Sequence, residues 1–296
     1  MSHLISQRSE IVFLYDCKMC NPNGDPLDGN RPRMDDANGR CLVTDVRLKR
    51  TIRDYLLETG YNGMQDPNKD IFIRDEDDKP VTGEQRSKSY EGKADFLNKF
   101  IDVRLFGGVS APGKAKEKVF NFTGPVQFGM GRSLNRVSIN FIKGTGAFAT
   151  SDTAAQKTFR EEYNISYGLI GFHGVINENA AKYTKLTELD VKLLLEALWM
   201  GTKGLLSRSK KGHMPRLLIK IDYSQPSYFI GDLVERIKVR CDQNVKEDAL
   251  SDVADYSLDV TELNAVLEKN QDKIARITVL QDERLLLSAP IYQPNE

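Results

Sequence analysis

A turn-rich loop that leads into an amphipathic helix constrains this chain more than any other feature. The loop occupies residues 21–33, NPNGDPLDGNRPR, and its Asn, Pro, Gly and Asp residues are typical of tight turns. The predicted helix over 44–59 places Leu48, Ile52 and Leu56 at the i, i+4, i+8 spacing of a buried face. The loop is therefore either a connector or a backbone-lined site at the start of the helix.

Positive charge gathers at this junction of loop and helix. The free backbone N–H groups and the dipole at a helix start already favour an anion. Thr44 has the residue type and position of an N-cap. The sequence therefore predicts a phosphate cradle, with an ordinary solvated surface helix as the alternative. The candidate contacts are Arg31, Arg33, Lys49, Arg50 and Arg53.

The overall charge gives a mixed signal. The 296 residues include 42 Lys and Arg and 42 Asp and Glu, and a net charge of zero is unusual for a nucleic-acid binder. The charges are segregated, however. Residues 203–220 contain six basic and no acidic residues, whereas 242–262 contain seven acidic and one basic residue. Segregation of this kind permits a basic groove on a neutral protein.

Length and hydropathy predict a globular protein. A chain of 296 residues can bury a large core in one or two domains. No apolar run approaches the length of a membrane span, and the N-terminus lacks the apolar core of a signal peptide. We therefore expect a cytoplasmic protein with no membrane partner.

The cysteines offer one candidate metal motif. Four cysteines are too few for a disulfide framework. Cys17 and Cys20 have zinc-knuckle spacing, but no second pair follows, and His3, His173 and His213 are scattered along the sequence. We therefore expect ordinary thiols near the end of a strand and predict no metal and no cofactor.

The order of predicted elements is typical of one topology. The strands are expected at 10–15, 119–128, 162–176 and 215–223, and the main helices at 44–59 and 187–203. This βαββαβ order is that of ferredoxin-like and RNA-recognition-motif folds. Further elements are expected as a short strand at 71–73, helices at 94–106 and 260–268, and a strand at 274–280.

Aromatic residues on the predicted strands admit two interpretations. RNA-recognition motifs stack bases on strand aromatics, but packing in a core explains the same residues equally well. The residues do not form the RNP signature. They are Phe120, Phe122, Tyr163 and Tyr167.

Several short motifs, in one order along the chain, resemble a known family. They are NPNGDP, NRPR and TDVRLKRTIRDYL after the first strand, DVRLFG at 102–107, TGPVQF at 123–128 and GRSL at 131–134. Over residues 9–225 the chain is similar to the backbone subunit of type I CRISPR surveillance complexes (Cascade). This is the Cas-seven family of the RAMP superfamily, and the resemblance is to its subtype I-B form first and its I-C form second.

The resemblance implies an α+β fold of four parts. The first is an RRM/ferredoxin-like palm over 1–59, 94–130 and 160–225. A helical fingers insertion is expected at 60–93, and a projecting thumb β-hairpin at 131–159. Residues 226–296 would form a C-terminal extension packed on the palm.

The resemblance also implies a role without catalysis. Copies of the subunit line up head to tail as a filament on one crRNA and present its bases to a target DNA strand. Further expected partners are a Cas-five-type subunit, large and small Cascade subunits, and a recruited helicase-nuclease, to which cleavage belongs. This subunit would have no catalytic residues and no cofactor or metal.

The resemblance extends the candidate crRNA contacts beyond the loop and the helix. It adds Thr44 at the helix start, the root of the arm and the basic loop before the last palm strand, and these further residues are Thr44, Arg132, Arg136, Arg208, Lys210, Lys211 and His213. The apolar residues considered for base displacement by the thumb are Ile142, Phe148 and Met130.

Two rival functions remain open. Related subunits of type III complexes are metal-dependent endoribonucleases that use an aspartate after the first palm strand. The corresponding region here contains Asp16, Asp25, Asp28, Asp35 and Asp36. The second rival is an RRM-like RNA-binding protein that does not assemble. A nucleotide site is disfavoured because the loop has neither a Walker pattern nor GxGxxG.

Overall fold

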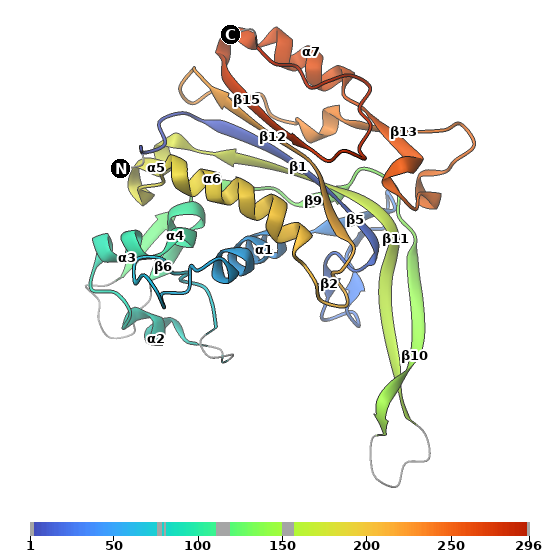
Figure 1. The fold of residues 1–296 in the computed structure, drawn as a ribbon, viewed down its shortest axis with the longest axis horizontal. Helices are drawn as coiled ribbons and strands as arrows, with labels where there is room; N and C mark the ends of the chain where they lie inside the picture. Colours follow the sequence, from blue (N-terminus) through green and yellow to red (C-terminus); the bar gives the residue numbers. More distant parts are fainter. Residues whose placement is uncertain (1–2, 76–78, 80, 111–118, 150–156, 295–296) are drawn as a thin grey trace.

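The structure is a computed structural model, and it describes residues 3–75, 79, 81–110, 119–149 and 157–294, without side chains at 145–149 and 157–160. Helices and strands are mixed, and most strands belong to one large antiparallel sheet (Figure 1). The predicted α+β class is therefore confirmed. No helix in the described part of the chain has the length and apolar character needed to cross a membrane.

Nine strands form the large sheet. Its main order is β15-β12-β1-β11-β9-β5-β4, and β8 and β10 pair with other parts of β11. The strands are β1 (Ser9–Cys20), β4 (Met34–Asp35), β5 (Arg40–Val43), β8 (Val126–Phe128), β9 (Gly131–Ser133), β10 (Ile139–Ala149), β11 (Lys157–Ile176), β12 (His213–Tyr223) and β15 (Ile274–Gln281). Short two-stranded sheets are formed by β2 (Gly24–Asp25) with β3 (Arg31–Pro32), β6 (Gly107–Ser110) with β7 (Phe120–Thr123), and β13 (Lys238–Cys241) with β14 (Tyr256–Asp259).

The central strand β1 is buried on both faces. It pairs antiparallel with β11 along one edge and with β12 along the other. Phe13 and Tyr15 contribute to the core on one face, and Val12 and Leu14 contribute to the core on the opposite face. An apolar run without alternation is what such a strand requires. The strand predicted at 10–15 is confirmed, and it continues to Cys20 because β11 pairs with it that far.

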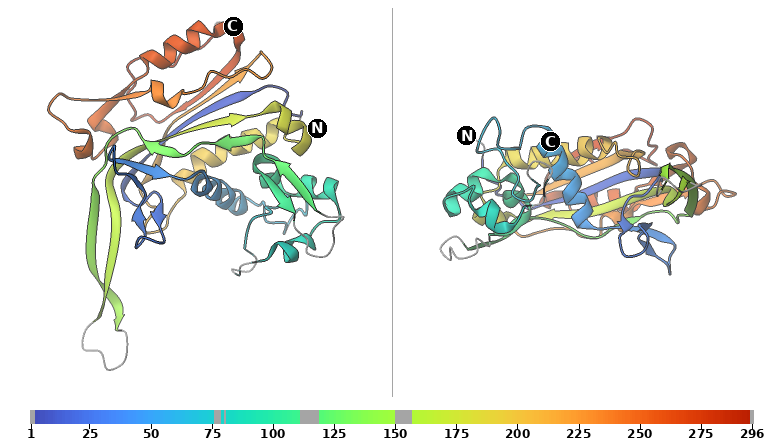
Figure 2. Two further views of the ribbon diagram at one scale, coloured as in Figure 1. Left: turned by 180° about the vertical axis from the view of Figure 1, so that it is seen from behind. Right: turned by 90° about the horizontal axis from the view of Figure 1, so that it is seen from below.

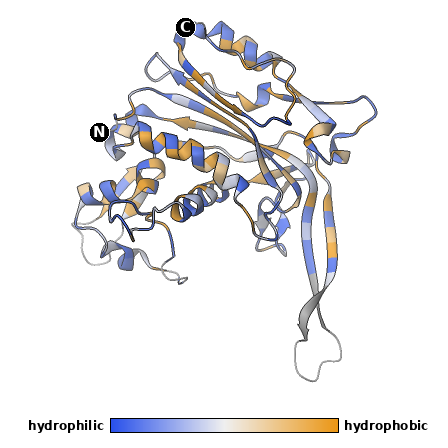
Figure 3. Ribbon diagram, viewed as in Figure 1, coloured by the Kyte–Doolittle hydropathy of each residue, from blue (hydrophilic) through white to orange (hydrophobic). Residues whose placement is uncertain are grey.

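Different segments cover the two faces of the sheet. The first face packs against α1 (Asp45–Glu58), α4 (Ile101–Phe106) and α6 (Glu188–Glu196), which continues as a π-helical turn over Ala197–Gly201. The second face packs against residues 233–292, including α7 (Thr261–Lys269). Figure 3 shows the hydrophobic residues along the sheet strands and α6. The helix α5 (Glu178–Thr184) also contributes Ala181 to the core on the first face, whereas α2 (Gly83–Ser87) and α3 (Lys93–Lys99) lie in the insertion after α1.

The helix predicted at 44–59 is confirmed with nearly the same bounds. Thr44 caps α1, since its hydroxyl accepts a hydrogen bond from the Arg47 backbone N–H. The predicted core side is buried at Leu48, Ile52 and Leu56. The helix ends before Gly60, whose φ of 103° lies in the region that favours glycine.

The insertion after α1 forms its own small aromatic core, in which Phe72, Phe96 and Phe100 pack together. The single helix predicted at 94–106 is broken at Phe100, whose backbone is extended and bridges to Asp70. The strand predicted at 71–73 does not form. The buried Asp102 carboxylate instead accepts hydrogen bonds from the backbone N–H groups of Phe72 and Ile73, at 2.7 and 3.2 Å.

A two-stranded arm projects from one end of the sheet (Figure 1). It consists of β10 and the part of β11 that pairs with it, and β11 then continues into the sheet beside β1. The sequence predicts an arm over 131–159. However, β9, at the start of that range, pairs with β5 and β11 inside the sheet, as the view from behind shows (Figure 2).

We expect the Asp102 carboxylate to be essential for stability. It also pairs with Arg53, whose Nε lies 2.9 Å away, and both side chains are largely buried. Asp102→Ala would leave this guanidinium and two backbone N–H groups without a partner. We therefore expect the unfolding free energy to fall by about 3–5 kcal/mol. Urea denaturation followed by circular dichroism measures this, with Asp66→Ala as the control because the Asp66–Lys69 pair is exposed. Equal losses in both variants would contradict the assignment.

We also expect Glu10 to give the fold an acid-sensitive contact. Burial would raise the pKa of Glu10, but hydrogen bonds from His173, Tyr223 and the Ile230 backbone hold it below its ordinary value of 4.5. The ionised carboxylate therefore stabilises the fold above about pH 4.5, and this contribution is lost as the pH falls through the lower native pKa.

Glu10→Gln tests this contact. At pH 7 the variant should lose about 2 kcal/mol of unfolding free energy. Its difference from the wild type should shrink as the pH falls below 4.5. The exposed Glu262→Gln is the control, and denaturation curves across this pH range give the comparison. A difference that stays constant with pH would be inconsistent with an ionised Glu10.

Candidate nucleic-acid interface

The turn after β1 is fixed to the start of α1 by one side chain. The Asn23 amide oxygen accepts hydrogen bonds from the Thr44 backbone N–H at 2.9 Å and from its hydroxyl at 3.0 Å. Within the turn, β2 and β3 pair as a small hairpin. Thr44 therefore both caps the helix and anchors the turn, and the predicted junction of loop and helix is a defined structure.

The two loop arginines differ in their surroundings. Arg31 is exposed and has no ion-pair partner within the described residues. Arg33 pairs with Asp25 at 2.9 Å, and its Nε is buried without a partner in that part of the chain. Both arginines line a hollow of about 320 Å³ that Thr44 and Met130 also line.

The predicted basic side of α1 faces inward more than outward. Lys49 pairs with Asp45 at 3.0 Å and lies 5.5 Å from the centre of the Phe106 ring. Arg53 is buried, with its guanidinium 5.3 Å from the same ring. Only Arg50 is strongly exposed among the three predicted helix cations, and it pairs with Asp54 at 2.6 Å. The helical period of the sequence places these residues on one side of α1, but it does not show that α4 packs against that side.

The basic loop before β12 lies against the turn. The Asn21 N–H donates to the Ser209 carbonyl at 2.9 Å, and the Lys210 ammonium donates to the Pro22 carbonyl at 3.0 Å. Burial lowers the pKa of Lys210 to about 8, and the charge of Arg47 acts in the same direction. Lys211, in contrast, is exposed. Segments 190 residues apart in the sequence thus form one surface.

A hollow of about 380 Å³ lies where the turn, the basic loop and the root of the arm meet. Arg208 lines it and makes a two-pronged ion pair with Glu162 of β11, with an N–O distance of 2.9 Å. Asn21 lines it as well, and its buried Oδ1 has no partner among the described residues. No sequence pattern singles out Asn21 as a site residue.

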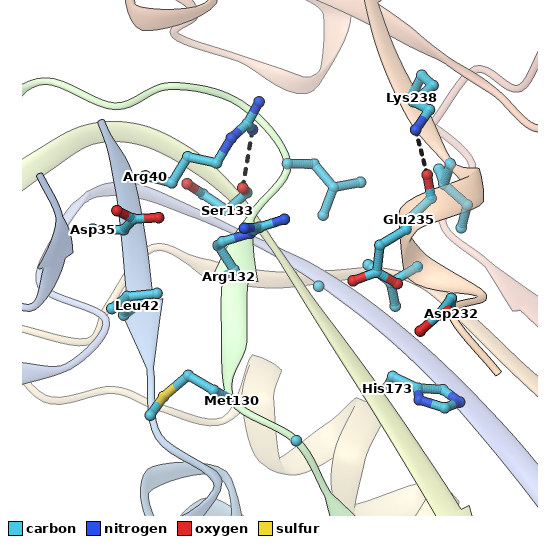
Figure 4. Close-up of a pocket in the computed structure, with 15 residues that line it drawn as sticks. Asp35, Arg40, Leu42, Met130, Arg132, Ser133, His173, Asp232, Glu235 and Lys238 are labelled. Atoms are coloured by element: carbon cyan, nitrogen blue, oxygen red, sulfur yellow. Dashed lines mark hydrogen bonds between the residues drawn. The ribbon is translucent and has the colours of Figure 1, made fainter. Parts of the chain in front are cut away.

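The remaining predicted cations lie in a different hollow, of about 600 Å³ (Figure 4). Arg132 of β9 lines it together with Arg40 and Lys238, but acidic side chains, including Glu235, line it too. Arg136 is exposed beside this hollow, and its Nε donates to the Asn38 carbonyl at 3.2 Å. The predicted contacts therefore line three hollows, and the hollow of Arg31 and Arg33 adjoins that of Arg132 because Leu42 and Met130 line both.

The arm carries an aromatic pair that the sequence analysis did not assign to it. Phe141 of β10 and Tyr163 of β11 lie opposite each other, with ring centres 4.8 Å apart. Lys143 lies 5.3 Å from the Phe141 ring centre. Ile142 is half-buried and opposite Glu162, while the Phe148 side chain is outside the described residues. The remaining strand aromatics Phe122 and Tyr167 are buried in cores.

His213 is buried at the end of β1. Its Nδ1 lies 3.6 Å from the Cys20 sulfur, and the Cys17 and Cys20 sulfurs lie close enough to each other to form a disulfide. Burial lowers the pKa of His213 to about 4, so its ring is neutral at pH 7. The expectation of scattered histidines and ordinary thiols was wrong here, because the pairing of β1 with β12 brings residues 17 and 213 side by side.

Three of the aspartates considered for catalysis, Asp25, Asp28 and Asp36, line one hollow together with Arg31 and Arg33. Asp16 is buried and accepts a hydrogen bond from Arg216 at 2.7 Å, and burial raises its pKa despite that pairing. Asp25 pairs with Arg33, and Asp35 accepts from the Asn38 side chain at 2.7 Å. Within the described residues, no group of three acidic side chains has the spacing of a metal site.

Comparisons with known proteins agree on one family. Residues 7–261 match the family model described as "CRISPR-associated protein Cas7". A protein of that name from Haloferax volcanii is 33% identical over 311 residues, which cover 95% of this chain and 88% of that protein. Two solved chains share the fold. One, titled "CRISPR RNA-guided surveillance complex", has a TM-score of 0.52 at 16% identity and covers 93% of this chain and 89% of its own.

The other solved chain is titled "CRISPR RNA-guided surveillance complex, pre-nicking". It has a TM-score of 0.54 at 15% identity and covers 98% of this chain and 95% of its own.

The pairing of Asp25 generates a prediction about metal-dependent cleavage. We expect no Mg²⁺-dependent cleavage of a guide-paired RNA, because Asp25 is neutralised by Arg33 and no three acidic side chains in the described part of the chain have the spacing of a metal site. Denaturing gels of labelled RNA incubated with the protein and Mg²⁺ or Mn²⁺ provide the measurement. Cleavage by the wild type that disappears in Asp25→Ala would overturn this expectation.

Proposed function

This chain belongs to the Cas7 family of CRISPR-associated proteins, and from that premise we propose that it is the crRNA-binding backbone subunit of a type I surveillance complex. The observation that carries the proposal is the family match over residues 7–261. The meeting of the turn, the basic loop and the arm supports it, because a guide strand needs an extended surface of this kind. The I-B-like subtype is part of the proposal.

The central strands support an RRM-like palm. The strands β12, β1 and β11, with β8 on the other edge of β11, place the fourth, first, third and second strands of the βαββαβ order side by side, which is the ferredoxin-like arrangement. The insertion that carries α2 and α3 would then be the fingers, and the β10/β11 arm the thumb. The segment after β12 would be the extension, and its pairing of β15 with β12 supports that assignment.

We place the crRNA on the side of the sheet where α1 lies, between the arm and the insertion (Figure 1). A guide must be held by its phosphates and riboses so that its bases remain free to pair with target DNA. Arg31, Arg50 and Lys211 are exposed cations for the phosphates. Asn21 Oδ1 is an acceptor suited to a ribose 2′-hydroxyl.

The less exposed candidates have supporting roles in this proposal. Arg53 holds α1 to the insertion through Asp102, and His213 lies beneath the basic loop. Arg208 is held by Glu162 and would reach phosphate only by exchanging that partner. Arg132 and Arg136, which are exposed near the arm root, are proposed to contact a neighbouring copy or the target strand.

The aromatic pair on the arm is a candidate surface for displaced bases. Base stacking on an aromatic side chain contributes about 1–3 kcal/mol. Phe141 is exposed at 46%, and Lys143 beside it adds a positive charge. We add Phe141 and Tyr163 to Ile142 and Phe148 as arm residues that contact RNA.

Assembly follows from repetition of one contact. Copies joined head to tail use two different surfaces and build a helix when the rotation does not close. The proposed partners are further copies, a Cas-five-type subunit, large and small subunits and the recruited helicase-nuclease. The backbone subunit itself is proposed to be non-catalytic.

Removal of two exposed cations should weaken guide binding. We expect Arg31→Ala/Lys211→Ala to lower crRNA affinity by about 100-fold, because two charge-assisted contacts are lost. The slope of log affinity against log salt should fall by about two in magnitude. Nuclease protection of the bound crRNA, read by sequencing, should show evenly spaced steps for the wild type and weaker steps for the variant.

A charge-matched control uses exposed lysines of the C-terminal segment. Lys246→Ala/Lys269→Ala removes two positive charges away from the turn and should leave the affinity within about threefold of the wild type. A single short footprint that does not lengthen with protein concentration would remove the backbone-subunit proposal. It would favour an RNA-binding protein that does not assemble.

A further inference from the structure

Two cysteines and a histidine form a buried cluster beneath the junction of the turn and the basic loop. One ligand atom from each of Cys17, Cys20 and His213 lies within 4.8 Å of the others. The three residues are at most 5% exposed. No other group of three His, Cys, Asp or Glu residues with this spacing occurs in the described part of the chain.

The backbone brings these side chains together by a local departure from regular strand geometry. In a regular strand, residues three apart point to opposite faces. Met19 lies between the two cysteines with a φ of 49°, which turns Cys20 back toward Cys17. On the neighbouring strand, Gly212 has a φ of 116°, and its carbonyl accepts from the Lys18 N–H at 3.1 Å. His213 follows directly and faces the cysteines.

We propose that Cys17, Cys20 and His213 bind a thiophilic divalent cation, of which Zn²⁺ is the representative. Sulfur and imidazole nitrogen are the ligands that Zn²⁺ prefers, and C-x-x-C is a common spacing for two of them. Binding to the dithiol form releases both thiol protons. Two thiolates, one neutral imidazole and Zn²⁺ then sum to zero charge, so the burial of the cluster is not opposed by a net charge.

The surroundings of His213 fit this role. Its Nδ1 lies against both the Cys20 sulfur and the Lys210 carbonyl oxygen. A ring nitrogen bound to metal would give up its contact with the Lys210 carbonyl, and that oxygen is then a candidate for the fourth ligand. The structure records the cluster in its oxidised state, with Cys17 and Cys20 paired as a disulfide, and formation of that bond from two thiols needs an oxidant.

A metal at this position would join two segments that are distant in the sequence. Cys20 directly precedes the turn, and His213 directly follows the basic loop. Hydrogen bonds between Asn21 and Ser209, and between Lys210 and Pro22, already connect these segments. The cation would therefore fix the relative position of the turn and the loop, independently of what the surface binds.

Metal content and spectroscopy test the proposal without any RNA. The full-length protein, purified under reducing conditions, should contain about one Zn²⁺ per chain by mass spectrometry. Replacement by Co²⁺ should give the thiolate charge-transfer bands and visible bands of a tetrahedral site. Cys17→Ser and Cys20→Ser should lose the metal and the bands, whereas Cys241→Ser, which changes a cysteine outside the cluster, should keep both.

Two further measurements keep the test decisive if a serine variant folds poorly. His213→Cys preserves a three-ligand set and should retain Co²⁺ with an additional thiolate contribution to its spectrum. Alkylation of free thiols in the native protein, with and without a chelator, should show Cys17 and Cys20 protected only while the metal is bound.

Three results would overturn the metal site. They are metal content near background in the reduced wild-type protein, metal content unchanged in Cys17→Ser, and an intact mass that shows a Cys17–Cys20 disulfide after lysis with alkylation.

Discussion

The burial of β1 on both faces and along both edges is the constraint on which the rest of the structure depends. A strand in this position has no access to water, so every polar side chain on it needs a partner within the protein. Asp16 has Arg216 and Tyr167, and Glu10 has His173 and two backbone N–H groups. These partners come from β11, β12 and the segment after β12, and they determine how each is positioned.

The positions of the segments around β1 also determine which charged side chains are paired and which remain exposed. Three of the seven acidic residues in segment 242–262 form ion pairs inside the chain. Glu247 lies 3.5 Å from Arg40, Asp252 lies 2.9 Å from Lys18, and Asp259 lies 2.6 Å from Arg240. Exposed pairs of this kind add little stability, but they cancel charge. Cations without such partners, including Arg31 and Lys211, therefore contribute most to the field that reaches solvent.

Patterns of local origin predicted much of the fold. The helix over 44–59, the bend at Gly124–Pro125 between β7 and β8, and the long strand that ends at Ile176 follow from periodicity and turn residues. The break at Phe100 and the burial of Arg53 do not, because both depend on side chains that reach across from other segments. His213 is likewise distant from Cys17 and Cys20 in the sequence, and the pairing of β1 with β12 brings them together in space. The sequence predicts which residue types and which regions form the site, but it does not predict how exposed each side chain is.

The length of β11 has a mechanical consequence. One strand of 20 residues, about 65 Å when extended, runs from the arm into the middle of the sheet without a hinge residue between. The arm is thus supported at one end only, where β11 lies between β1 and the short strands on its other side. A force applied at the tip of the arm therefore bends or twists a continuous ladder of backbone hydrogen bonds. The stiffness of the arm is therefore set by the sheet at its supported end. A change in that sheet can be transmitted through the arm to any molecule that the arm contacts.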